Sequence, residues 1–125
     1  MGQLKTIFKE SGTVTAANAS PMSDGAAALI ICSGKAVKQY RLPVLARITG
    51  WADANQIGID FTTSPALAIP KALAKAGRQL SEVEYFEINE AFSSVALANI
   101  KILGLDGDNV NVWGGSVALG HPLGW

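Results

Sequence analysis

Short apolar runs alternate along the chain with longer segments whose apolar residues recur at helical spacing. Residues 26–32 form a uniformly apolar run that ends at Ser33 and Gly34, which predicts a strand covered on both faces. Looser alternation over 44–52 predicts a second strand. Residues 83–88 and 110–113 predict a third and a fourth.

Three segments between these runs predict helices. Residues 34–40 suit a short helix that Pro43 prevents from extending. The second helix opens at Ser64 as the cap, with Pro65 in the first helical position, and Gly77 ends it. Pro70 lies within it and predicts a kink or a separate first turn. The third helix covers 92–103 and ends at Gly104.

Strands that alternate with helices imply an α/β layered sheet. A chain of 125 residues suits one domain at most. Residues up to Ser23 are rich in Thr, Ser, Gly and Asn and predict a loop. The glycine-rich segment 114–124 resembles a loop that feeds a helix, yet only Trp125 follows it, so we expect a truncated domain.

Composition excludes several classes of function. The formal net charge is +0 with no basic cluster, which argues against nucleic-acid binding. No apolar run reaches the roughly 18 residues of a membrane span, and the N-terminus lacks the features of a signal peptide. The single cysteine, Cys32, excludes a disulfide framework within the chain and fits a reducing compartment.

Candidate chemistry gathers in three loop segments, residues 15–25, 89–92 and 114–124. The second and third follow predicted strands, and in open α/β sheets ligands bind beyond the carboxyl ends of strands. We therefore expect a ligand site where these loops meet.

Two polar residues of these loops have alternative interpretations. His121, the only histidine, lies between Gly120 and Pro122 on a stiff backbone, as a general base or donor requires, or it is an ordinary surface residue. Asn89 holds a carbonyl oxygen or a water, or it caps the next helix. Glu90 shares this ambiguity, and Glu87 favours a structural role.

Cys32 closes an apolar run without electropositive neighbours, so we interpret it as a buried small hydrophobe. The glycine-rich segment lacks the Gly-Lys-Ser/Thr ending of a phosphate-binding loop.

Four blocks of sequence resemble the thiolase family, in particular its biosynthetic acetyl-CoA acetyltransferases. They are Gly-Thr-Val-Thr-Ala-Ala-Asn-Ala-Ser at 12–20, Ser-Asp-Gly-Ala-Ala-Ala at 23–28, Asn-Glu-Ala-Phe at 89–92, and Gly-Gly through Gly-His-Pro-Leu-Gly at 114–124. The blocks occur in family order and at family-like spacing, from about Leu4 to Gly124.

The resemblance implies a fold. Thiolases are built from two similar βαβαβαββ halves, and residues 1–125 resemble a partial C-terminal half, a layered βαβαβ half-fold truncated before its last helix and strands. Residues 1–25 correspond to a loop region with a coenzyme A contact motif, and 26–125 to the α/β core.

The resemblance also implies a reaction, the reversible condensation of two acetyl-CoA into acetoacetyl-CoA and CoA through a cysteine thioester. His121 matches the histidine that activates the cysteine and helps bind the thioester oxygen. Asn89 matches the asparagine that positions a water in that oxyanion site. Ser20 matches a contact to the pantetheine arm, Phe92 matches a pocket-lining position, and Gly120 allows close backbone approach to the substrate.

The two cysteines on which the family's catalysis depends have no match here, and Cys32 corresponds to neither. We therefore expect the chain alone to be inactive. The alternative is a truncated module that associates with full-length thiolase subunits. Coenzyme A thioesters are substrates, and no cofactor, metal, nucleic acid or membrane partner is expected. The family forms dimers or tetramers in the cytoplasm, which we favour here, or in peroxisomes or mitochondria.

Overall fold

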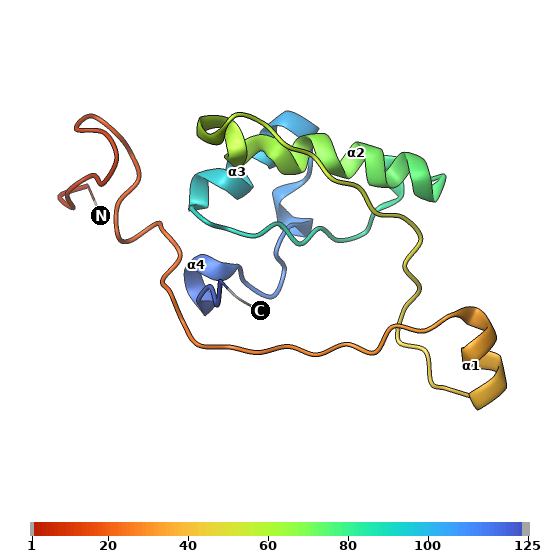
Figure 1. Ribbon diagram of the computed structural model, residues 1–125. Coiled ribbons are helices and arrows are strands. Elements are labelled where there is room, and N and C mark those ends of the chain that lie inside the picture. Colours follow the sequence, from red (N-terminus) through yellow and green to blue (C-terminus); the bar gives the residue numbers. More distant parts are fainter. Residues whose placement is uncertain (1, 124–125) are drawn as a thin grey trace.

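The computed structural model describes residues 2–123, and the expectations about Gly124 and Trp125 lie outside them. Four α-helices and three 3₁₀ turns follow one another along the chain (Figure 1). The helices are α1 (Gly34–Tyr40), α2 (Ser64–Ala76), α3 (Ser93–Leu103) and α4 (Ser116–Leu119); the turns are η1 (Gly58–Thr63), η2 (Leu80–Glu82) and η3 (Gly107–Asn109).

Helices α2 and α3 lie side by side and cover the extended segment 83–92 (Figure 1). The centre of the core is a cluster of Phe86, Ile88, Val95 and Val110, all less than a tenth exposed. Ile69 of α2 and Ile100 of α3 pack against it. Burial of these side chains is the main force that holds the two helices to the extended segment.

A buried amide ties the two helices together. Asn99 of α3 is fully buried, and its Oδ1 accepts a hydrogen bond of 2.8 Å from the Ala66 N–H in the first turn of α2. Its Nδ2 donates to Thr62 O and Val95 O at 2.8 and 2.7 Å. Thr63 is the N-cap of α2 and makes no side-chain capping bond. Asn99 therefore satisfies an N–H of this helix end from a neighbouring helix.

The predicted helices are confirmed, with corrections at their ends. Gly77 and Gly104 end α2 and α3 in the left-handed conformation, at φ +64° and +66°. The prediction that Ser64 caps α2 is wrong, because Ser64 is its first residue and Pro65 its second. Pro70 lies inside one continuous helix, so no separate first turn forms.

The predicted strands are only partly present. Phe86 and Val110 form a parallel bridge, so segments 83–88 and 110–113 do lie alongside each other. Segments 26–32 and 44–52 do not form strands, because no other part of residues 2–123 supplies the backbone partner that a strand needs. They leave and re-enter the packed part as the two sides of an arm, residues 26–49, that carries α1 away from the other helices (Figure 1).

The arm is apolar and exposed. Leu45 is 99% exposed and Ile30 94%, and α1 has no buried residue. Cys32 is exposed as well, so its interpretation as a buried small hydrophobe is wrong for this chain. The apolar run is real, but nothing among the described residues covers it.

Candidate active site

The three loop segments singled out in the sequence meet in space. The His121 N–H donates to Pro21 O at 2.9 Å, within a parallel bridge between Met22 and His121. On the other side, the Ser20 N–H donates to Ala91 O at 3.1 Å. The first loop therefore lies between the second and the third and is bonded to both.

Asn89 and His121 face each other at this junction. The Asn89 Nδ2 lies 3.2 Å from the His121 Nε2. Because the amide nitrogen only donates, the ring nitrogen accepts in this arrangement, and a neutral His121 then carries its proton on Nδ1. The helix-cap interpretation of Asn89 is wrong, since Phe92 is the N-cap of α3.

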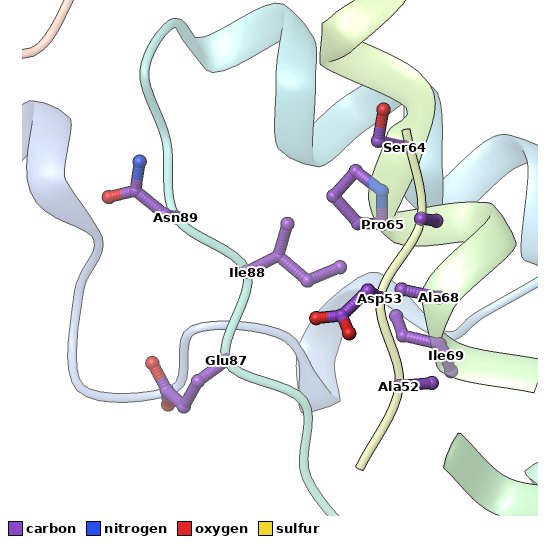
Figure 2. A pocket seen from close by; sticks show the side chains of 10 residues that line it. Ala52, Asp53, Ser64, Pro65, Ala68, Ile69, Glu87, Ile88 and Asn89 are labelled. Carbon is purple, nitrogen blue, oxygen red and sulfur yellow. The ribbon is translucent and has the colours of Figure 1, made fainter. Parts of the chain in front are cut away.

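Alternation along the extended segment directs Asn89 towards the site. Phe86 and Ile88 are buried in the core, so Glu87 and Asn89 project from the opposite face. Figure 2 shows Ile88 pointing towards Pro65, while the amide of Asn89 points away from it. Two core residues thus fix the direction of a polar one.

His121 is held by its own loop as well as by Asn89. Gly120 has φ +100°, a conformation that L side chains rarely adopt, and a Cβ there would collide with the hydroxyl of Ser23. Pro122 follows, and a Cβ on Gly25 would meet its ring. The imidazole is half-buried and its backbone is fixed by the first loop, so His121 is not a freely moving surface residue.

Ser20 forms a pair of hydrogen-bonded hydroxyl groups with Ser116, close to the contact between Asn89 and His121. Its Oγ donates to Glu90 O and lies 2.8 Å from Ser116 Oγ at the start of α4. The Glu90 N–H donates to the same Ser116 Oγ at 3.1 Å. Ser20 is therefore beside the junction and already bonded to both neighbouring loops.

Phe92 lies at the edge of the junction. Its ring packs against the core cluster and meets the ring of Phe8 edge to face, with centroids 5.4 Å apart. The backbone of the preceding Ala91 is bonded to Ser20, so the position is close to the site. Part of the Phe92 ring surface is therefore taken up by contacts with the core cluster and with Phe8.

A cavity of about 440 Å³ opens on the other side of Asn89. Figure 2 shows its apolar wall of Pro65, Ala68, Ile69 and Ile88, with the carboxylate of Asp53 at the centre. Ser20, Phe92, Gly120 and His121 do not line it. Asn89 thus separates this cavity from the junction with His121.

Sequence reasoning missed two polar residues of this region. Asn111 bonds Ile88 and Glu90 through its side chain, and Ser116 bonds Glu90 and Ser20. Asn111 interrupts the apolar run of 110–113, the same signal that drew attention to Asn89. α4 was also missed, because four residues between glycines give no periodic pattern.

Neither a membrane-spanning helix nor a metal-binding cluster occurs among residues 2–123. No helix there is both long and apolar enough to cross a bilayer. No three side chains of His, Cys, Asp or Glu within that range gather as a metal site would need.

Comparison with known proteins places this arrangement in context. Residues 42–125 match the family model for the thiolase C-terminal domain, and residues 1–35 match that for the thiolase N-terminal domain. An acetyl-CoA acetyltransferase of Schizosaccharomyces pombe is 60% identical over 121 residues, which are 97% of this chain and 31% of that protein. A cytosolic acetyl-CoA acetyltransferase of Gibberella zeae is 58% identical over the same shares of the two chains.

About a third of one solved structure has the same fold as this chain. The Acat5 thiolase of Ascaris suum, in complex with coenzyme A, superposes with a TM-score of 0.94 at 48% identity. The match covers 98% of this chain and 33% of that one. The chain therefore spans about a third of the length of the relatives that it matches.

Proposed function

Because the chain belongs to the thiolase family, we propose that it forms the part of an acetyl-CoA acetyltransferase that holds the oxygen of a thioester carbonyl. The reaction is the reversible condensation of two acetyl-CoA molecules into acetoacetyl-CoA and CoA, by way of an acetyl-cysteine. The contact between Asn89 and His121 carries this proposal. The names of the relatives support the choice of acyl group.

The chemistry needs two fixed donors at one point. When a base removes a proton from the methyl group of an acetyl thioester, negative charge moves onto the carbonyl oxygen. The amide N–H of Asn89 and an N–H on the Nε2 of His121 are close enough to stabilise one oxygen, directly or through a water. Loss of one such donor typically costs about 2.7–4 kcal/mol of transition-state stabilisation.

His121 serves in two protonation states. With its proton on Nδ1, the free Nε2 takes the proton of a thiol and so favours the thiolate that attacks the thioester. Once it has taken that proton, Nε2 becomes a donor to the developing oxyanion. The same ring thus assists attack and then stabilises the product of attack.

The coenzyme A arm lies along the first and third loops in this proposal. Ser20 and Gly120 lie close to His121, with the Gly120 backbone packed against Ser23, and Phe92 supplies apolar surface nearby. Acyl transfer between thioesters changes no oxidation state, so the reaction asks for no redox cofactor.

The chain supplies no nucleophile at this site. Its only cysteine, Cys32, lies on the exposed arm just before α1, and Figure 1 shows α1 far from α4. Removal of a covalent nucleophile removes the pathway, whatever donors remain. We therefore propose that the chain alone does not turn over acetoacetyl-CoA.

A chimera tests the site. The matched 121 residues of the Schizosaccharomyces pombe relative are replaced by those of this chain, and thiolysis of acetoacetyl-CoA is followed by absorbance. His121→Ala and Asn89→Ala are expected to lower kcat at least 100-fold, while Asn55→Ala, an exposed amide, leaves it unchanged. An active chimera that keeps full turnover after both changes would refute the proposed site.

The same assay on the chain by itself tests the second claim. No turnover above the uncatalysed rate is expected. Turnover that His121→Ala abolishes would contradict the claim that the chain is inactive alone.

A second candidate function is association with a full-length thiolase subunit. The arm, residues 26–49, exposes large apolar side chains, and such patches mark interaction surfaces. Its conformation is nevertheless that of a longer thiolase, since the superposition with the Ascaris suum protein covers 98% of the chain. Assembly with thiolase subunits would cover the arm. We place this assembly in the cytosol, because the Gibberella zeae relative is named as a cytosolic enzyme.

Co-purification tests this association. The chain is expected to be retained by an immobilised full-length Schizosaccharomyces pombe acetyl-CoA acetyltransferase. Ile30→Glu and Leu45→Glu, which place charges on the arm, are expected to abolish retention, whereas Glu84→Lys on an exposed position outside the arm keeps it. A stable, monodisperse monomer that is not retained would count against the association.

A further inference from the structure

Asn111 lies at the point where the parallel pairing of Phe86 with Val110 stops. The Phe86 N–H donates to Asn109 O at 2.9 Å, and the Asn111 N–H donates to Phe86 O at 2.8 Å. In a regular parallel ladder, the next pair of bonds would join Ile88 to the main chain of residues 111 and 113. Asn111 instead has φ +52°, and the main chain turns away.

The side-chain amide of Asn111 makes the two bonds that the main chain leaves out. The Ile88 N–H donates to Asn111 Oδ1 at 2.8 Å, and Asn111 Nδ2 donates to Ile88 O at 2.9 Å. A carboxamide has the same donor and acceptor as a peptide unit, so it continues the pairing by one step. Asn is also among the few residues that adopt a left-handed backbone at low cost.

The same Nδ2 reaches one residue past Asn89. It donates to Glu90 Oε1 at 3.0 Å, and the other carboxylate oxygen of Glu90 accepts from the Val117 N–H of α4 at 3.2 Å. Gly115 makes this approach possible, because a Cβ there would fall inside the Glu90 carboxylate. Asn111 is thus linked through Glu90 to the loop that carries His121.

These bonds surround Asn89 without touching its side chain. The N–H and C=O of Ile88 are bonded to Asn111, while the N–H and C=O of Glu90 are bonded to Ser116 and Ser20. The backbone on both sides of Asn89 is therefore fixed by residues from other segments. Its amide is left facing His121.

We propose that Asn111 is a positioning residue, which sets the contact between Asn89 and His121 through the backbone of Ile88 and the carboxylate of Glu90. It touches no reacting atom. The inference rests on the proposed function for its catalytic consequence, but the placement itself is a property of this chain. Misplacement of reacting groups by about 1 Å costs on the order of 100-fold in rate.

The lone histidine makes the placement measurable. In the full chain labelled with ¹⁵N, the two ring nitrogens of His121 give the only imidazole signals, and the Nε2 shift reports whether this atom accepts a hydrogen bond. Asn89→Ala defines the shift of a lost contact. Asn111→Gly, which keeps the left-handed backbone but removes the amide, is expected to produce more than half of that shift.

The controls separate placement from unfolding. Asn55→Gly, an exposed amide outside the site, is expected to leave the Nε2 signal in place. Backbone amide signals of α2 and α3 report that each variant is folded. If Asn111→Gly does not fold, Asn111→Asp carries the test, because it keeps the acceptor for Ile88 but sets a carboxylate against Glu90, and it too is expected to move the Nε2 signal.

A folded Asn111→Gly or Asn111→Asp variant with an unmoved His121 signal overturns the inference. In the chimera, Asn111→Gly is expected to lower kcat about 10- to 100-fold with little change in KM. If Asn89→Ala leaves chimera turnover intact, the proposed function fails while the placement still stands. If Asn89→Ala abolishes turnover but Asn111→Gly changes neither kcat nor the imidazole signal, the positioning role alone fails.

Discussion

The arm and the three-loop junction use opposite means of organisation. The arm, residues 26–49, carries one of the most apolar runs of the sequence and is almost entirely exposed. The junction of residues 15–25, 89–92 and 114–123 is polar, and its loops are bonded to one another over sequence separations of up to 100 residues, between Pro21 and His121. Apolar side chains are stabilised by burial against any apolar surface, because the hydrophobic effect has no direction. Hydrogen bonds are directional, so they select particular partner groups.

The first prediction compares one substitution in both regions. Ile88→Ala removes a side chain that is 4% exposed, and about 2–5 kcal/mol of unfolding free energy is expected to be lost. Ile30→Ala, at 94% exposure, is expected to change it by less than about 0.5 kcal/mol. Urea unfolding followed by circular dichroism measures both. An equal loss at Ile30 would show that the arm is covered in solution.

The second prediction removes a buried amide. Asn99→Ala leaves the Ala66 N–H and the Thr62 C=O without their hydrogen-bond partner. Because each buried polar group without a partner is costly, the free energy of unfolding is expected to fall by about 2–4 kcal/mol. The control Asn55→Ala removes an exposed amide whose Oδ1 bonds only the adjacent N–H, and little change is expected. Unfolding in urea checks the pair. Similar small losses for both would mean that water replaces Asn99 at the start of α2.

The third prediction concerns helix ends. Gly104 ends α3 at φ +66°, so Gly104→Ala is expected to cost about 1–2 kcal/mol. On the arm, Arg41 ends α1 in the same conformation, at φ +51°. Arg41→Gly relieves this, but α1 is unpacked, so the global unfolding midpoint is expected to stay within error. A raised midpoint would show that α1 unfolds together with α2 and α3.

The smallest effect is expected at Glu82, on the exposed surface of the packed part. Hydrogen bonds from the Gln79 N–H and then from Arg78 hold the pKa of Glu82 below its ordinary value of 4.5. A lowered pKa stabilises the folded state above the unfolded pKa, and this contribution is lost as the pH falls through the lower, folded value. Thermal melts of Glu82→Gln and the unchanged chain should therefore differ slightly at pH 7 and converge once the pH has fallen below the lowered pKa of Glu82. A difference that persists in acid would contradict an ionic origin.

Much of the site could be predicted from the sequence. The family, its fold class and the meeting of the three loops followed from motifs that bear chemistry, and the structure brings Asn89 and His121 within 3.2 Å. The glycines that end α2 and α3 could also be predicted, because the left-handed backbone at a helix end favours glycine. What these features share is a strong local preference of particular residue types.

The rest depended on partners that local patterns do not encode. Residues 26–32 were expected to be buried. An apolar run indicates that burial is favourable, but it does not identify the surface against which the run packs. None of residues 2–123 packs over it. Ser64 was expected to cap α2, but that end is satisfied by Asn99, 35 positions away from it in the chain. Asn111 was assigned to a strand, because a side chain that imitates a peptide unit gives no periodic signal.

The close approach of the Glu90 carboxylate to Gly115 has an evolutionary consequence. Because the carboxylate of Glu90 occupies the place of a side chain at 115, these two positions make one joint choice, although they lie 25 residues apart. A lineage that gains even a methyl group at 115 must shorten or move the acid at 90, and so must rebuild the anchorage of α4. A substitution at position 90 or 115 is therefore expected to depend on the residue at the other position. Related chains should keep both Glu90 and Gly115 or have replaced both.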